Sequence, residues 1–188
     1  LFLYIFLVLM WCNVGFADNF YQLRLDEIKI GDSLLNYANE VDIKNTINPE
    51  KFKKKKFSTS AFDVRGVSEN FDQLEISFKT TDKEYKILHI GGSKLTNGMD
   101  DCISKRDNIL KQYSSSLKNL KKEGPKTNNH PADRSGKSKI TDVLYIFDSG
   151  FLHASCIDWS EEIGYKDHLN FQILEKEFMY WMQKNIKY

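Results

Sequence analysis

The sequence predicts an α+β protein, with an antiparallel sheet of about five strands in ββαβββα order, helices packed on it and a short helical N-terminal segment. Three observations predict this class. Two runs of alternating apolar and polar residues come first, a stretch with apolar residues seven positions apart follows, and three more alternating runs precede a final amphipathic stretch. Alternation with a period of two indicates strands, whereas spacings of three, four and seven indicate helices.

Length and charge limit what the chain can do. It has 188 residues, 41% of them hydrophobic, and 27 basic side chains oppose 26 acidic ones for a formal net charge of +1. This length and apolar fraction suit one domain with its own core. The near-neutral balance excludes a globally basic nucleic-acid binder and an acidic solvating tail.

The first 17 residues have the pattern of an export signal. Residues 1–11 are all apolar or aromatic, and Gly15 and Ala17 frame a cleavage position before Asp18. An apolar run of this length is too short for a permanent membrane anchor. We therefore expect a single exported domain at residues 18–188. The alternatives are an uncleaved segment that tethers the protein to the inner membrane and a buried N-terminal strand or helix.

The start of this domain should hold short elements. Residues 20–30 alternate apolar and charged side chains and end at Gly31. Asp32 or Ser33 can then cap a helix that extends to about Asn39.

Two further stretches precede the sheet. Residues 41–45 can form another turn of helix. Residues 51–56 contain five lysines around Phe52, and this favours a solvated segment over an anionic lipid or nucleic-acid patch.

The first two strands are expected at residues 71–80 and 84–90. Apolar side chains of the first share one face: Leu74, Ile76 and Phe78. The polar connection 81–83 is short, so the two runs should pair as a hairpin, and the glycines that follow should end the second strand.

A long amphipathic helix is expected at residues 99–122. Its apolar stripe includes Ile103, Leu110 and Leu117. Asn97 can cap it, and Cys102 falls in its first turn.

Residues 123–139 are polar, carry Pro125 and Pro131, and are expected to form a long loop. Residues 135–138 read Ser-Gly-Lys-Ser, as at the end of a phosphate loop. The glycine needed five positions before Gly136 is Pro131, however, and a strand rather than a helix should follow. We therefore expect no nucleotide site.

The next element is a hairpin of residues 141–147 and 151–158. A three-residue loop at 148–150 would place Phe147 opposite Phe151.

This register sorts the hairpin into two faces. The face beneath the long helix would hold small and aliphatic residues: Leu144, Ile146, Leu152, Ala154 and Cys156. The other would hold Val143, Tyr145, Phe147, Phe151, His153 and Ser155. We take Tyr145, Phe147, Phe151 and His153 as a candidate binding face; the alternative is a second, covered core layer.

The pattern of the remaining sequence predicts a strand at 168–173 and a helix at 174–185. The buried stripe of that helix would be Leu174, Phe178, Trp181 and Met182. Such a stripe favours core packing over a cofactor site.

Export would leave two cysteines, Cys102 and Cys156, which are expected to form a disulfide in an oxidising compartment. The bridge would close a loop of about 54 residues, which the chain-entropy estimate values at about 4 kcal/mol. Two separate buried thiols, or a reactive or metal-binding cysteine, are the alternatives.

Catalytic or metal-binding signals are weak. None of the four histidines stands in a metal-ligand spacing, so we predict no metal, no cofactor and no catalytic residue. His153 with Tyr145, or Asp158 with His168, could still assemble a general base in space. The acidic residues 158–162 suggest a solvated helix start at Ser160 rather than a cation site.

Several motifs together resemble an uncharacterised family of small exported proteins from AT-rich marine alphaproteobacteria. They are residues 30–35 (IGDSLL), 102–107 (CISKRD), 135–138 (SGKS), 155–160 (SCIDWS) and 167–169 (DHL). The resemblance implies export and a single domain, and it implies no activity.

The sequence thus favours a periplasmic or secreted, non-catalytic module that binds an envelope protein or a small ligand. It would contact a membrane only through the signal segment. A small hydrolase-like enzyme using His153 or His168 and a membrane-tethered envelope protein are the alternatives.

Overall fold

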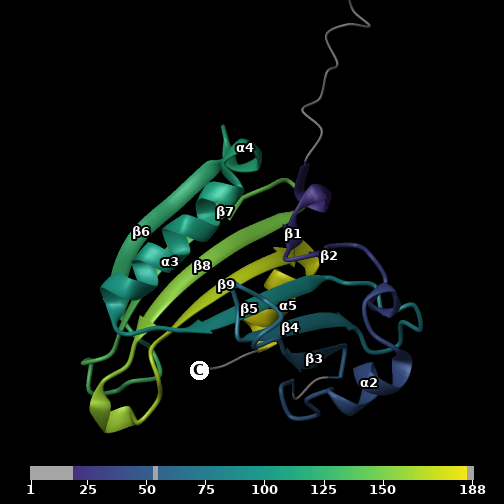
Figure 1. Cartoon of the computed structure of the whole chain (residues 1–188), viewed down its shortest axis with the longest axis horizontal. Coiled ribbons are helices and arrows are strands. Elements are labelled where there is room, and N and C mark those ends of the chain that lie inside the picture. The colour runs from purple at the N-terminus through teal and green to yellow at the C-terminus, as the bar shows by residue number, and fades with distance from the viewer. Residues whose placement is uncertain (1–18, 53–54, 186–188) are drawn as a thin grey trace, which may run out of the picture.

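The structure is a computed structural model that describes residues 19–52 and 55–185, and the predicted export signal lies outside them. Within these residues a seven-stranded antiparallel sheet has the order β3-β4-β5-β9-β8-β7-β6 (Figure 1). The strands are β3 (Phe57–Asp63), β4 (Gln73–Lys79), β5 (His89–Leu95), β6 (Lys121–Asn129), β7 (Lys139–Ile146), β8 (Gly150–Asp158) and β9 (His168–Glu175). A small second sheet pairs β1 (Arg24–Leu25) with β2 (Ile28–Lys29).

Helices flank the main sheet on both sides. They are α2 (Glu40–Asn45), α3 (Met99–Gln112), α4 (Ser114–Leu117) and α5 (Lys176–Asn185), with short 3-10 turns at Asn19–Gln22, Leu34–Asn36 and Glu161–Ile163. In the part of the chain that the structure describes, no helix has the length and apolar character needed to cross a bilayer.

The two faces of the sheet are covered differently, and we name them by their helices. The α3 face carries the larger core, which includes Ile76, Ala154 and Phe171. The α5 face carries a smaller cluster of Phe52, Phe57, Leu88, Phe151, Leu174 and Phe178. The predicted stripe of the last helix is confirmed from Phe178 onward, since Phe178 is buried and Trp181 and Met182 pack against the same cluster. Leu174 is buried as well, but it belongs to β9, because α5 begins at Lys176.

The α+β class is confirmed, whereas the predicted five strands and their order are incomplete. Four of the five predicted strands correspond to β4, β7, β8 and β9, whereas the strand expected at 84–90 is displaced, because β5 begins only at His89. Strands β3 and β6 extend the sheet at its two edges. Every residue of β6 is exposed, and its sequence has no alternation of apolar and polar residues from which a strand could be predicted. The predicted loop at 123–139 is therefore partly wrong, because its first half belongs to this edge strand.

The sequence predicts that the glycines after residue 90 end a strand. They lie inside β5 instead. A side chain at Gly92 would stand 2.5 Å from the ring of Phe71, and one at Gly91 would stand 3.1 Å from the ring of His89. The glycines permit close packing rather than a turn.

The predicted long helix is interrupted. Helix α3 ends at Gln112, α4 follows, and the chain enters β6 at Lys121. The N-cap of α3 is Gly98 rather than the predicted Asn97. The backbone N–H of Asn97 donates a hydrogen bond to the carboxylate of Asp101.

In the lysine-rich segment 51–56, residues 53 and 54 lie outside the described ranges, and Lys55 and Lys56 are exposed, as predicted. Phe52 is buried in the α5 cluster. Lys51 pairs with Glu75, and Lys56 pairs with Glu177 at 2.9 Å.

The register of the β7–β8 hairpin differs by one residue from the prediction. Ile146 pairs with Phe151 and Tyr145 pairs with Leu152, so four residues rather than three connect the paired positions. Gly150 belongs to the strand and pairs with Glu175 of β9. A side chain there would stand 2.2 Å from the ring of Phe20, which explains why β8 begins with a glycine.

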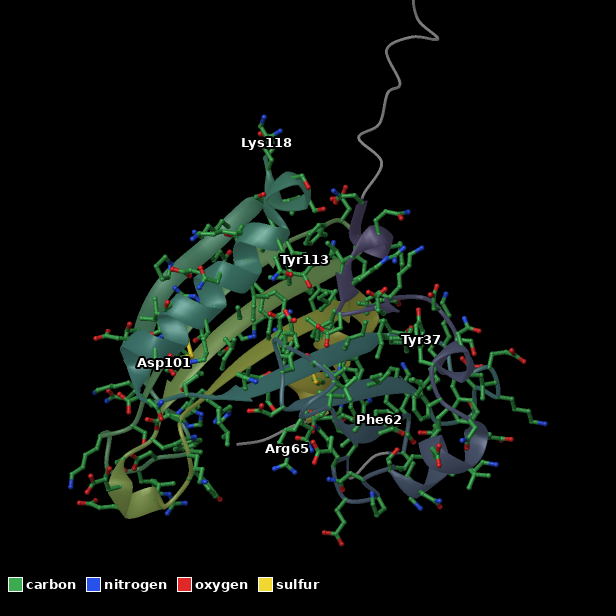
Figure 2. All side chains as sticks on the ribbon, in the orientation of Figure 1. Tyr37, Phe62, Arg65, Asp101, Tyr113 and Lys118 are labelled. Atoms are coloured by element: carbon green, nitrogen blue, oxygen red, sulfur yellow. A yellow bond between two sulfur atoms is a disulfide. The ribbon has the colours of Figure 1, made fainter. Side chains whose placement is uncertain are left out.

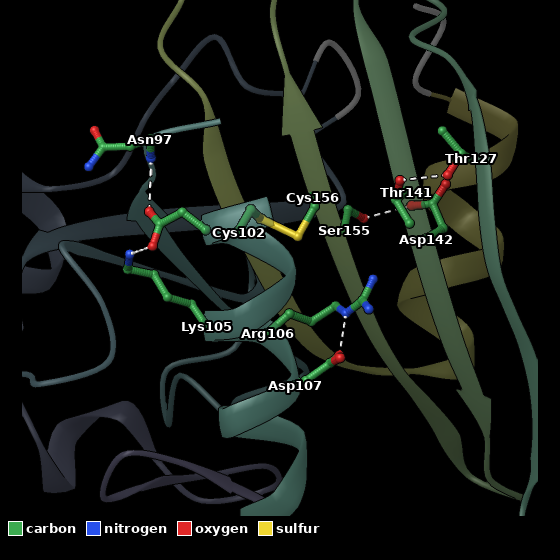
Figure 3. The surroundings of a disulfide bond; sticks show 11 residues. Asn97, Cys102, Lys105, Arg106, Asp107, Thr127, Thr141, Asp142, Ser155 and Cys156 are labelled. Atoms are coloured by element: carbon green, nitrogen blue, oxygen red, sulfur yellow. Dashed lines mark hydrogen bonds and ion pairs between the residues drawn. A yellow bond between two sulfur atoms is a disulfide. The ribbon is translucent and has the colours of Figure 1, made fainter. Parts of the chain in front are cut away.

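The predicted disulfide between Cys102 and Cys156 is present, with 5.6 Å between the Cα atoms (Figure 3). It joins the first turn of α3 to the C-terminal half of β8. Both cysteines are buried, so the bridge ties the helix to the sheet inside the larger core.

Candidate functional site

The four residues predicted as a binding face do not share a surface. Tyr145 and Phe147 belong to the α3 face, where the ring of Phe147 packs 5.5 Å from that of Phe20. Phe151 is buried beneath α5. His153 lies on the α5 face with 29% of its side chain exposed. The predicted shared face is wrong, because the register shift moves every β7 side chain to the opposite side.

On the α5 face, Asp142 of β7 meets His153 and Ser155 of β8. Oδ1 of Asp142 lies 3.0 Å from Nε2 of His153 and accepts a hydrogen bond of 2.8 Å from Oγ of Ser155. Oγ of Ser155 is also 3.2 Å from the same ring nitrogen. Burial raises the pKa of Asp142, but the hydrogen bonds from His153 and Ser155 outweigh it and leave that pKa below its usual value.

This cluster differs from a serine-hydrolase relay. In such a relay the acid and the serine contact opposite nitrogens of the imidazole, so that the ring can carry a proton between them. Here both contact Nε2, and the serine hydroxyl donates to the carboxylate. Ser155 is also only 4% exposed. The three groups satisfy one another and supply no activated nucleophile.

Neither catalytic pair considered from the sequence is brought together. Tyr145 and His153 lie on opposite faces of the hairpin, because Tyr145 pairs with Leu152. His168 pairs with Ile157, so Asp158 projects from the other face. The Nδ1 atom of His168 instead lies 2.9 Å from the carbonyl oxygen of Lys166.

A second set of hydrogen-bonded polar side chains is buried under α5. Oγ of Ser77 lies 2.8 Å from Oγ1 of Thr59 and 3.0 Å from Nδ1 of His89. The His89 ring stacks on Phe178 with 5.1 Å between ring centroids. Burial, together with the charge of Lys51, lowers the pKa of His89 to about 3. His89 is therefore neutral in the folded protein at ordinary pH.

The Ser-Gly-Lys-Ser segment forms no phosphate cradle. The carboxylate of Asp133 accepts hydrogen bonds of 2.8 Å from the backbone N–H groups of Ser135 and Ser138, and one of 2.7 Å from the hydroxyl of Ser138. These hydrogen bonds hold the pKa of Asp133 well below its usual range. An internal anion thus occupies the donors that a phosphate would need.

Metal-binding clusters are absent from residues 19–52 and 55–185, where no three His, Cys, Asp or Glu side chains gather as ligands. In the acidic run at 158–162, Ser160 is the N-cap of a 3-10 turn, although its side chain makes no capping hydrogen bond.

The feature best suited to bind a ligand is a groove of about 860 Å³ on the α3 face, which we call the α3 groove. One wall is the end of α3, the second is the β1–β2 hairpin, and the third is the connection 64–71 between β3 and β4. Figure 2 labels Tyr113 at the end of α3 and Tyr37 across from it, and both line this groove. Its size is within the range of small-molecule sites.

Local interactions hold each wall in place. The hydroxyl of Tyr113 donates to the backbone carbonyl of Arg24 and ties the hairpin to α3. Asp26 turns that hairpin with a φ of 48°, a conformation that aspartate and asparagine tolerate better than most residues. The hydroxyl of Ser68 accepts from the N–H of Phe71, which directs that ring onto Gly92.

The floor of the groove is apolar and partly aromatic. Leu23, Phe71, Leu74 and Ile109 are all at most 5% exposed. The ring of Tyr113 stacks on Phe171, at 5.5 Å between centroids, and Phe171 lies 6.2 Å from Phe71.

The rim is acidic. Asp26 and Glu27 stand on the hairpin and Glu69 stands on the opposite connection, all three exposed. Burial and the charge of Asp26 raise the pKa of the Tyr113 phenol, so this phenol is neutral. The sequence did not reveal these residues because they come from three distant segments with no motif among them.

Comparison with known proteins found no matching family model, no matching curated protein and no matching solved structure.

Proposed function

We propose that this protein is an exported, non-catalytic binding module that holds a small ligand in the α3 groove. The observation that carries the proposal is the groove itself. It combines an apolar floor with unpaired polar groups at the rim, which is the usual composition of a ligand site. The Asp142–His153–Ser155 cluster supports a hydrolase less well, because its members saturate one another.

Export is part of the proposal. A disulfide at the core of the domain fits an oxidising compartment such as the periplasm. N-terminal sequencing of the protein from its host would test this directly. A start at Asp18 would agree with a cleaved signal, whereas a retained leader would favour the membrane-tethered alternative.

Binding can be tested with a neutral fluorescent probe, N-phenyl-1-naphthylamine, whose emission rises in apolar sites. Gln112 is exposed and lines the groove, so Gln112→Trp should fill it with little effect on the core. Ser104→Trp, also exposed on α3 but not part of the groove lining, is the matched control. We expect saturable emission from the wild type and the control, and a loss of at least several fold in affinity for Gln112→Trp. Equal binding by both variants would exclude the groove as the site.

A further inference from the structure

We propose that the α3 groove selects a small organic cation that carries an apolar group, such as a substituted ammonium compound. This inference depends on the proposed binding function and specifies its ligand class. Three features of the groove carry it.

The first feature is a set of carboxylates without internal partners. Among the residues that the structure describes, Asp26, Glu27 and Glu69 form no ion pair and no side-chain hydrogen bond. Other carboxylates do have such partners, as Asp101 pairs with Lys105 on α3 and Asp72 pairs with Lys94 at 2.9 Å. The rim charges are therefore free to meet a cation.

The second feature is their placement. Asp26 and Glu27 stand on one wall and Glu69 on the facing one, so a bound cation would lie between negative charges on two sides. The lining contains a single basic residue, Arg24. Two walls of like charge favour a positive ligand and disfavour an anionic one.

The third feature is the aromatic and apolar floor. Tyr113 lines the groove, and Phe71 and Leu74 lie below it. Aromatic rings attract ammonium groups, and apolar side chains take up hydrocarbon. Carboxylates and aromatics in one groove together match an amphipathic cation better than a sugar or an inorganic ion.

Three probes with one apolar body separate charge from hydrophobicity: 4-phenylbutylamine, 4-phenylbutan-1-ol and 4-phenylbutyrate. Titration followed by two-dimensional amide NMR gives an affinity for each and shows whether the groove residues respond. We expect the amine to bind roughly tenfold more tightly than the alcohol, equivalent to about 1.4 kcal/mol, and the acid to bind most weakly.

A charge-matched pair of variants completes the test. In Asp26→Asn/Glu27→Gln/Glu69→Gln we expect the amine to lose most of its tenfold advantage while the alcohol keeps its affinity. The control Glu50→Gln/Glu84→Gln/Glu161→Gln removes the same charge from exposed sites outside the groove and should retain the advantage. The NMR spectra report whether each variant is folded.

The outcomes distinguish this inference from the proposed function. Equal binding of amine and alcohol at the groove would overturn the cation assignment and leave a binding module. Equal loss in both triple variants would assign the effect to overall charge and also overturn it. If no probe shifts the groove residues, the binding function itself fails and the inference with it.

Discussion

The two faces of the sheet both carry carboxylates, but they use them differently. On the α5 face, Asp142 is saturated by His153 and Ser155. At the α3 groove, Asp26, Glu27 and Glu69 have no such partners within the described residues. An Asp, a His and a Ser that contact one another can therefore serve only to stabilise the fold. A ligand binds more readily where polar side chains have no partner within the protein, as at the rim of the α3 groove.

The largest expected effect tests whether the faces are independent. Phe178→Ala removes a fully buried ring that contacts Phe52, Phe57 and His89 on the α5 face. We expect a loss of roughly 3–5 kcal/mol in the free energy of unfolding, measured in urea. Binding of N-phenyl-1-naphthylamine by the folded variant should be unchanged; a large loss of binding would show that α5 supports the groove.

The disulfide gives the next effect, this time on the α3 face. Cys102 and Cys156 are separated by 54 positions. Replacing both with alanine should lower the free energy of unfolding by roughly 2–4 kcal/mol, chiefly because the unfolded chain gains freedom. Dithiothreitol should destabilise the wild type similarly and leave the variant unaffected. If reduction does not change the urea midpoint, the bridge contributes little to stability.

Acid should lower the free energy of unfolding through His89, which lies among the buried polar side chains of the α5 face. Because burial lowers the pKa of His89 from 6.5 to about 3, its contribution is fully present above pH 6.5 and is lost as the pH falls toward 3. Between pH 7 and pH 5 we expect a loss of about 2 kcal/mol. Burial raises the pKa of Glu175, which acts in the opposite direction. His89→Gln isolates the histidine, and an unchanged pH dependence in this variant would assign the acid sensitivity elsewhere.

The smallest effect sharpens the interpretation of the Asp142–His153–Ser155 cluster. Ser155→Ala removes one hydrogen bond to Asp142 and should cost about 1 kcal/mol in urea unfolding, because Asp142 keeps its contact with His153. Affinity for probes of the α3 groove should stay the same. A hydrolytic activity that disappears in Ser155→Ala would contradict the structural role.

Much of the fold could be predicted because the signals are local. Leu74, Ile76 and Phe78 alternate and do face one side of the sheet. Cys102 and Cys156 do meet, since the expected helix and the expected strand each present one of them to the same core. Phe178 is buried and Trp181 and Met182 pack against the same cluster, as their spacing indicates.

Errors arose where a residue type has two uses. The sequence predicts that Gly92 ends a strand and that Gly150 lies in a turn, whereas both glycines belong to strands and accommodate the rings of Phe71 and Phe20. Those rings come from distant parts of the chain, so local propensity could not reveal the contact. The misplaced Gly150 shifted the β7 register by one residue and divided the predicted aromatic face.

The sequence by itself determined the α+β class, four of the five inner strands, the apolar stripes of the helices and the two cysteines available for pairing, because periodicity and composition act over short ranges. Only the tertiary structure decided which edge strands complete the sheet, how the hairpin is registered and where the groove lies. The groove draws its walls from α3, the β1–β2 hairpin and the 64–71 connection. Packing alone brings these segments together, and no single stretch of sequence encodes that meeting.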